Sequence, residues 1–204
     1  MANDSHRRKL KQGAEPWNEW KRLYPETVVD LSYADLSGLN LSGANLSHAN
    51  LHRVDFRGTD LSGANLGGAD FSGYHYDGAG FTANLTEANL SHADLSKANF
   101  DTGNLTKADL RESNLTEANL SATSLVQANL SNANLAWADL SVGKLSEASL
   151  KNADLHWADF RHADLSGADL SQTVLLWVNF CSANMNRTNF SGPGWVGRDF
   201  LSVI

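Results

Sequence analysis

Residues 83–100 read ANLTEANLSHADLSKANF, and in this stretch a bulky apolar residue recurs at every fifth position. Leu85, Leu90, Leu95 and Phe100 each follow Asn or Asp, which in turn follows Ala. Two mostly polar residues separate one such phrase from the next. A period of five fits neither an α-helix, which has 3.6 residues per turn, nor a simple strand, which has a period of two. The chain must therefore turn at regular intervals.

The same phrase extends over most of the chain. Counted in steps of five from Leu31, with one residue missing before Leu85, it gives 35 bulky apolar positions that end at Phe200. This count includes Tyr76 and Phe81, and all eight Phe of the chain fall on it. In 28 of the 35 repeats the preceding residue is Asp or Asn. Such regularity indicates a repeat architecture.

The spacing within each phrase predicts how the chain turns. Side chains along an extended segment alternate in direction, so the Ala and the bulky residue two positions later face the same interior. The two residues that follow are often Ser or Gly, which suit a turn. Repetition of this unit winds a coil whose interior is a column of Leu and Phe with small Ala between them.

The tandem A(D/N)LXX pattern resembles the pentapeptide-repeat family, and the resemblance covers residues 29–200. It implies an all-β fold, a right-handed quadrilateral parallel β-helix with four repeats per coil. The 35 repeats would then make between eight and nine coils. With neighbouring coils about 4.8 Å apart, the rod would be on the order of 40 Å long. Many members of this family have no assigned biochemical function, so the resemblance names no partner.

We expect two parts in the chain, residues 1–28 and residues 29–204. Residues 15–24 place Trp17, Trp20 and Leu23 at helical spacing, which predicts a short helix that lays its aromatic side chains over the first coil as a cap. A hydrophobic helix that docks a partner is the alternative. The basic segment HRRKLKQ before this helix is expected to form a solvated, disordered arm.

Two segments depart from the repeat. The stretch from Tyr74 to Asn84 has Tyr in place of the inward Ala and then lacks one residue, which predicts a bulge or a small surface loop. The C-terminal sequence SGPGWVGRDFLSVI loses the Ala-Asn-Leu phrase but keeps Trp195 and Phe200 in register. It is expected to be the closing coil, which protects the end of the solenoid.

The composition predicts a cytoplasmic protein without a membrane span. The sequence contains neither a run of 18 apolar residues nor a signal-peptide core. Cys181 is the only cysteine, so an internal disulfide is excluded. The formal net charge is −7, and residues 29–204 carry 10 basic against 19 acidic residues, a net of −9.

Catalytic and metal-binding patterns are not found in the sequence. Asp and Asn recur before the bulky residue throughout, so they mark the coil and not an acid/base pair. No two outward histidines occupy the same position four repeats apart, and no Cys/His cluster exists. We therefore expect a protein that is not an enzyme and holds no metal or cofactor.

Three tryptophans stand out because they occupy a position that is usually small or polar. Trp137, Trp157 and Trp177 lie four repeats apart in the second position after the bulky residue, so they should stack on one side of successive coils. Further steps of the same length continue this column upstream through five more positions. The predicted interaction patch comprises Trp137, Trp157, Trp177, Leu176, His156 and Val196, and the column upstream is expected to be Glu117, Lys97, Gly78, Gly58 and Gly38.

Two functions remain open at this point. An exposed patch of this kind favours a protein-binding scaffold or a homodimer, whereas stacking of the indoles alone would only stabilise the coil. The alternative function is DNA mimicry directed at a type II topoisomerase such as DNA gyrase, which the resemblance and the acidic charge suggest together. In neither case is direct binding to nucleic acid or to a membrane expected.

Overall fold

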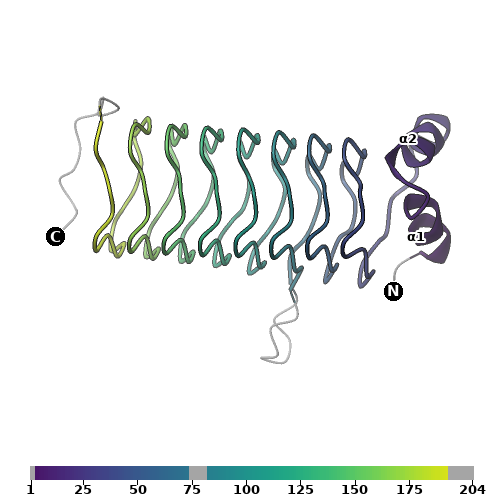
Figure 1. The fold of residues 1–204 in the computed structure, drawn as a ribbon, viewed down its shortest axis with the longest axis horizontal. Coiled ribbons are helices and arrows are strands. Elements are labelled where there is room, and N and C mark those ends of the chain that lie inside the picture. The colour runs from purple at the N-terminus through teal and green to yellow at the C-terminus, as the bar shows by residue number, and fades with distance from the viewer. Residues whose placement is uncertain (1–2, 74–81, 193–204) are drawn as a thin grey trace.

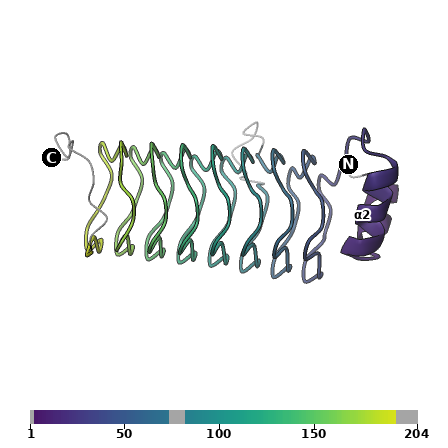
Figure 2. The same cartoon turned by 90° about the horizontal axis from the view of Figure 1, so that it is seen from above.

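The structure, a computed structural model, describes residues 3–73 and 82–192. These residues form a rod of stacked coils, closed at the N-terminal end by two short helices (Figure 1). The coils lie one above another along the rod with nearly constant spacing (Figure 2).

Parallel pairing holds successive coils together. Asn84 pairs with Asn104, Asn104 with Ser124, and Ser124 with Lys144, so each step advances the chain by four repeats. The bridges are isolated because each extended segment is only a few residues long before the next turn. This arrangement confirms the predicted right-handed quadrilateral parallel β-helix with four repeats per coil.

Each corner of the coil is a tight turn. In the turn at Leu155 the amide of Ala158 donates to the carbonyl of Leu155 at 3.0 Å. Trp157, the third residue of the turn, has φ 59°, as a type II turn requires. The same position has a positive φ at Gly38 and Gly63, where the missing side chain removes the strain.

A single apolar core fills the rod. The bulky residues and the Ala residues of most repeats are fully buried in one continuous cluster. Aromatic side chains contact one another along this core: the rings of Phe71 and Phe100 stack at 4.3 Å, and those of Phe160 and Phe180 at 5.3 Å.

The register around the irregular segment differs from the sequence prediction. Asp55 pairs with Asn84, and Asp70 with Asn99, so this one step is nine residues longer than every other step between coils. Leu85 therefore follows Phe71 directly around the coil, and the segment between them holds the nine extra residues.

Two details of the prediction change as a result. The prediction of one missing residue was wrong, and the register of the described coils does not count Tyr76 and Phe81. They fall in residues 74–81, which the structure does not describe, and Trp195 and Phe200 also lie outside the described residues. Within the described residues, nine core positions precede the inserted segment and 22 follow it, which makes just under eight coils.

The N-terminal residues form two helices, α1 (Asp4–Leu10) and α2 (Ala14–Leu23). The disordered arm predicted at HRRKLKQ was wrong. Asn3 caps α1 by accepting hydrogen bonds from the amides of Ser5 and His6, and Leu10 is fully buried in the core cluster. Burial of Leu10 ties the basic helix to the rod.

Side chains of the cap satisfy the exposed edge of the first coil. The Trp17 indole donates to the carbonyl of Asn45 at 2.6 Å, and the Asn45 amide donates to the side-chain oxygen of Asn18 at 2.7 Å. The amide of Asp30 donates to the His6 ring at 3.2 Å. The prediction of a capping helix over the first coil is thus confirmed, with a second helix in addition.

Candidate functional site

The three tryptophans form an ordered stack along one corner of the rod, which we call the tryptophan ladder. The rings of Trp137 and Trp157 lie 5.0 Å apart at an angle of 9°, and those of Trp157 and Trp177 lie 5.2 Å apart at 13°. This spacing matches the distance between neighbouring strands. The predicted stacking is therefore confirmed.

The ladder is exposed even though its rings cover one another. Trp137 is 57% exposed, Trp157 44% and Trp177 61%, so the middle ring is the most covered. Because the ring faces lie against one another, mainly the ring edges point outward. Three neighbouring indoles of this exposure make a contiguous apolar surface of a kind that soluble monomers seldom carry.

Backbone hydrogen bonds connect the ladder to the rest of its corner. The amide of Trp157 donates to the carbonyl of Leu176, that of Trp137 to His156, and that of Glu117 to Ala136. Further upstream the same kind of hydrogen bond connects Lys97, then Gly68, and finally His48 in the first coil. We call the resulting edge of the rod the ladder corner; its residues are His48, Gly68, Lys97, Glu117, Trp137, Trp157 and Trp177.

The upstream part of this column was predicted wrongly. Lys97 lies above Gly68 and then His48, not above Gly78, Gly58 and Gly38, because the inserted segment shifts the register by nine residues. Gly38 and Gly58 lie on another corner, and Gly78 is outside the described residues.

The remaining patch residues flank the ladder. His156 and Leu176 are half-buried beside the tryptophans, and the His156 ring contacts the Asp154 carboxylate closely. Val174 pairs with Asp154 in the neighbouring coil, so an apolar side chain replaces the usual Asp or Asn at the end of the rod that carries Trp177. Val196 lies outside the described residues, and whether these residues bind a partner stays a prediction.

Several charged side chains of the rod form ion pairs. Lys97 Nζ lies 3.7 Å from Glu117 Oε2 at the foot of the ladder. Hydrogen bonds from the Arg111 guanidinium hold the pKa of Asp109 below its usual range. The Arg57 guanidinium lowers the pKa of Asp55 in the same way. These pairs cover individual carboxylates and create no cluster of reactive groups.

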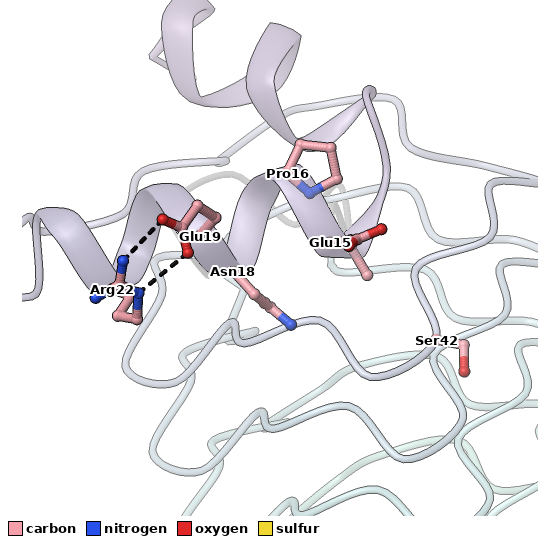
Figure 3. Close-up of a pocket in the computed structure, with 7 residues that line it drawn as sticks. Glu15, Pro16, Asn18, Glu19, Arg22 and Ser42 are labelled. Carbon is pink, nitrogen blue, oxygen red and sulfur yellow. Dashed lines mark hydrogen bonds and ion pairs between the residues drawn. The ribbon is translucent and has the colours of Figure 1, made fainter.

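A shallow depression beside α2 is a weaker candidate for a binding site than the tryptophan ladder. Its lining includes Glu15, Asn18, Arg22 and Ser42 (Figure 3). Arg22 donates to both oxygens of Glu19 at 3.0 and 2.8 Å, and Asn18 is engaged with the backbone of the first coil. Arg22 and Glu19 therefore bind each other, and Asn18 and Ser42 bind the backbone of the coils.

Metal ligands do not converge within residues 3–73 and 82–192, where no group of three His, Cys, Asp or Glu side chains is placed to hold an ion. Cys181 is exposed, and it is a free thiol. In the part of the chain that the structure describes, no helix has the length and apolar character needed to cross a membrane.

Comparison with known proteins identifies the repeat. A family model described as pentapeptide repeats matches the chain in eight copies, over residues 34–73 and, in overlapping matches, 83–192. No curated protein sequence matches the chain.

Solved structures with a similar fold include three pentapeptide-repeat rods of low identity. QnrB1 in a trypsin-treated form, a plasmid-mediated fluoroquinolone resistance protein, is 24% identical over 76% of this chain and 79% of its own, with a TM-score of 0.46. HetL, involved in heterocyst differentiation regulation in the cyanobacterium Nostoc, is 24% identical over 84% and 93%, with a TM-score of 0.32. A protein from the thylakoid lumen of Arabidopsis thaliana is 28% identical over 69% and 68%, with a TM-score of 0.25.

Proposed function

Since this chain belongs to the pentapeptide-repeat family, we propose that it is a non-enzymatic binding protein that uses the outside of its rod. The contact surface is the tryptophan ladder together with His156 and Leu176. One observation carries this proposal: three stacked indoles remain between 44% and 61% exposed. Tryptophan is enriched in the energetically important centres of protein interfaces.

Backbone geometry argues that the indoles serve more than the coil. Trp137, Trp157 and Trp177 have φ between 59° and 64°, a conformation that costs an L-residue roughly 1–2 kcal/mol. Two stacked ring pairs contribute about 0.5–1.5 kcal/mol each. Glycine meets the backbone requirement at Gly38 and Gly63 without that strain. Three such residues cost roughly 3–6 kcal/mol and the two ring pairs return about 1–3 kcal/mol, so stacking offsets only about half of the strain. A stable coil at this corner therefore does not require tryptophan.

The chemistry of the surface indicates the kind of contact. Ring edges of stacked indoles are apolar with a positive partial charge, so they favour aromatic faces and apolar side chains. Leu176 and Val174 extend the apolar area at one end. The neighbouring polar groups are occupied locally, as in the contact of His156 with Asp154. A partner that covers the ladder would bury an apolar centre with a polar rim, as interfaces commonly do.

Replacement of the ladder tests this proposal. We expect the triple variant Trp137→Ser, Trp157→Ser and Trp177→Ser to remain folded, because each side chain points outward and Ser is common in the turns. It should lose the protein contacts that the parent makes in crosslinking and affinity capture, with each buried Trp contributing about 2 kcal/mol or more.

A matched control uses the same position of the turn on another corner. Lys107, Gln127 and Glu147 also have positive φ and are exposed. Their replacement by Ser should leave every contact in place. If the tryptophan variant keeps all contacts of the parent and only melts at a lower temperature, the ladder stabilises the coil and the proposed function is wrong.

The acidic surface favours a second candidate, a DNA mimic that binds a type II topoisomerase. Residues 29–204 carry a net charge of −9, and a row of Asp and Asn runs along each side of the rod. Arginine side chains interrupt these rows at Asp55, Asp109 and Asp159, where each carboxylate is paired. The local pairing weakens a continuous negative surface, and for this reason we place the tryptophan ladder first.

A further inference from the structure

We propose that the tryptophan ladder binds a second copy of this chain, in an antiparallel dimer that joins the two ladder corners. This inference rests on the proposed function, because it names the partner of the same ladder. The order of side chains along the corner carries it. Hydrogen bonds between coils give the order His48, Gly68, Lys97, Glu117, Trp137, Trp157 and Trp177. Because Asp30 pairs with Asn50, Val28 stands in line with His48 by register, just before the first coil, and the column then begins with Val28.

The order of these side chains is complementary to the same order read in the opposite direction, so the corner of one copy can pair with the corner of another. When a second corner lies against the first in the opposite direction, its three tryptophans meet Val28, His48 and Gly68. Lys97 of each copy then meets Glu117 of the other. The two-fold axis passes between the layers of Lys97 and Glu117, and every contact occurs twice, as an isologous interface requires.

The N-terminal half of the corner is shaped to accept the indoles. Gly68 has no side chain, and the His48 imidazole lies over it: a Cβ at Gly68 would be only 2.5 Å from His48 Nδ1. Gly67, the residue before Gly68 in the turn, also has no side chain, so the surface beside Gly68 is equally low. Val28 is 79% exposed. This low surface with one aromatic ring lies opposite the taller stack. An indole edge against an imidazole face is a favourable edge-to-face contact.

Charge selects the antiparallel direction. The side chains of Lys97 and Glu117 are 68% and 54% exposed, so each can reach a second partner across the interface. A parallel dimer of the same corners would bring Lys97 against Lys97 and Glu117 against Glu117. The antiparallel dimer replaces these two repulsive contacts with two ion pairs.

Of the two columns that flank the ladder corner, the following one places Asp70 against Asp139 of the other copy, whereas the preceding one adds no like charges. The preceding column holds the first residue of each turn, and reversal places Ser47 against His156, Gly67 against Ala136, and Ser96 against Thr116. Small residues thus face small residues, and the histidine faces a hydroxyl.

The corner is long enough for an interface of standard size. Eight layers about 4.8 Å apart extend over roughly 38 Å, so a contact strip about 20 Å wide is what such an interface requires. Specific interfaces of standard size bury about 800 Å² per partner.

Charge reversal of the central pair tests the proposal. Sedimentation of the full chain in reductant, which excludes a disulfide through the exposed Cys181, should show a dimer. Lys97→Glu or Glu117→Lys alone places like charges in both central contacts and should weaken the dimer about tenfold or more. An equimolar mixture of the two variants should recover the dimer, because in each central contact a carboxylate of one chain then faces an ammonium group of the other.

A matched control separates this effect from loss of the ion pair within one chain. Lys107 and Glu87 form the same kind of pair, 3.6 Å apart, on another corner. Lys107→Glu should leave the dimer unchanged. Recovery in the mixture also cannot come from intrachain pairing, because neither variant restores its own Lys97–Glu117 pair.

Two results would overturn the inference. If the chain sediments as a monomer up to about millimolar concentration, no dimer forms through this corner. If a dimer forms but neither charge reversal weakens it, the dimer uses another surface. The proposed function fails separately, when the triple tryptophan variant keeps every captured contact. A monomer whose other contacts depend on the tryptophans would leave the binding function standing with a different protein as its partner.

Discussion

The small residue two positions before the bulky residue, which is alanine in most repeats, sets the width of the coil. Ala93 and Ala153 are at most 1% exposed, and their methyl groups lie between the bulky side chains of neighbouring repeats. At Gly143, which occupies the same position, even an added Cβ would approach the carbonyl oxygen of Leu140 to 2.8 Å. The sequence pattern could predict this interior because side-chain alternation fixes which residues face it.

Ala153→Leu should destabilise the rod. The larger side chain adds atoms to a layer that is already filled, and overpacking of this kind costs roughly 1–3 kcal/mol. Ser166→Leu is the control, because Ser166 lies in the turn and takes no part in the core. Denaturant unfolding of both variants beside the parent measures the difference. Equal stability of Ala153→Leu and the parent would contradict the assigned register.

Exposure and stacking of the tryptophans could also be predicted residue by residue. Their spacing of four repeats equals the length of one coil, so each ring lies above the previous one. The place of His48 and Gly68 on the ladder corner could not be predicted in the same way. These two residues share a corner with Trp137 only because the step from Gly68 to Lys97 includes the inserted segment, and the length of that step is fixed by pairing between coils.

At the scale of elements, the inserted segment shows why periodicity alone gave a wrong register before Leu85. Tyr76 and Phe81 are bulky and lie five and ten residues after Phe71, so they imitate core positions. Local sequence cannot distinguish such residues from true repeats, because a coil is defined by the residues above and below it. The pairing of Asp55 with Asn84 settles the register.

The first helix illustrates a second limit of the sequence. Arg7, Arg8 and Lys9 favour solvent, and charge alone predicts a disordered segment. In the structure Asn3 caps the helix. Leu10 is buried in the core cluster, and His6 is buried against the tryptophans of α2. Tertiary contacts therefore decide the conformation here, as they commonly do for short helices.

Trp17→Ala should loosen the whole cap. Trp17 is fully buried, and its indole binds the carbonyl of Asn45 on the edge of the first coil. We expect a loss of about 3–5 kcal/mol at this end of the rod, typical of Trp→Ala in a core. The exposed edge should then pair with other chains.

Leu23→Ala on the same helix is the control, because Leu23 is 57% exposed. Hydrogen exchange of the first coil and light scattering follow both effects. If the first coil of Trp17→Ala exchanges as slowly as that of the control and the variant does not associate, the cap is not needed to protect the edge.

On the scale of the whole molecule, the rod combines repetition with a difference between its two halves. All four corners repeat the same backbone, yet the large exposed apolar side chains of the described coils are few. They are Val28, Tyr33, Trp137, Val142, Trp157 and Trp177. By register Val28 and the tryptophans share the ladder corner, whereas Tyr33 and Val142 share the next one. The repeat thus supplies a uniform support, and a few substitutions at the corners create a directional surface.

DNA mimicry would be a property of the complete acidic rod and makes a separate prediction. If the surface imitates DNA, the purified protein should inhibit supercoiling by DNA gyrase at near-stoichiometric amounts. Inhibition should weaken as salt rises, because charge-driven association is screened. The triple variant Asp139→Asn, Asp164→Asn and Asp169→Asn removes three charges. It should keep the turns, because Asn accepts the same local hydrogen bond elsewhere, as Asn119 does from the amide of Ser121.

This variant should inhibit less than the parent, while the triple tryptophan variant should inhibit equally, because it leaves the charge unchanged. The two surfaces therefore give opposite results in one assay. Loss of inhibition with the tryptophans, and not with the carboxylates, would assign gyrase binding to the ladder. Absence of inhibition at large excess in low salt would exclude mimicry toward the gyrase tested. The acidic charge would then serve solubility, which a net charge of −7 supports by mutual repulsion of the rods.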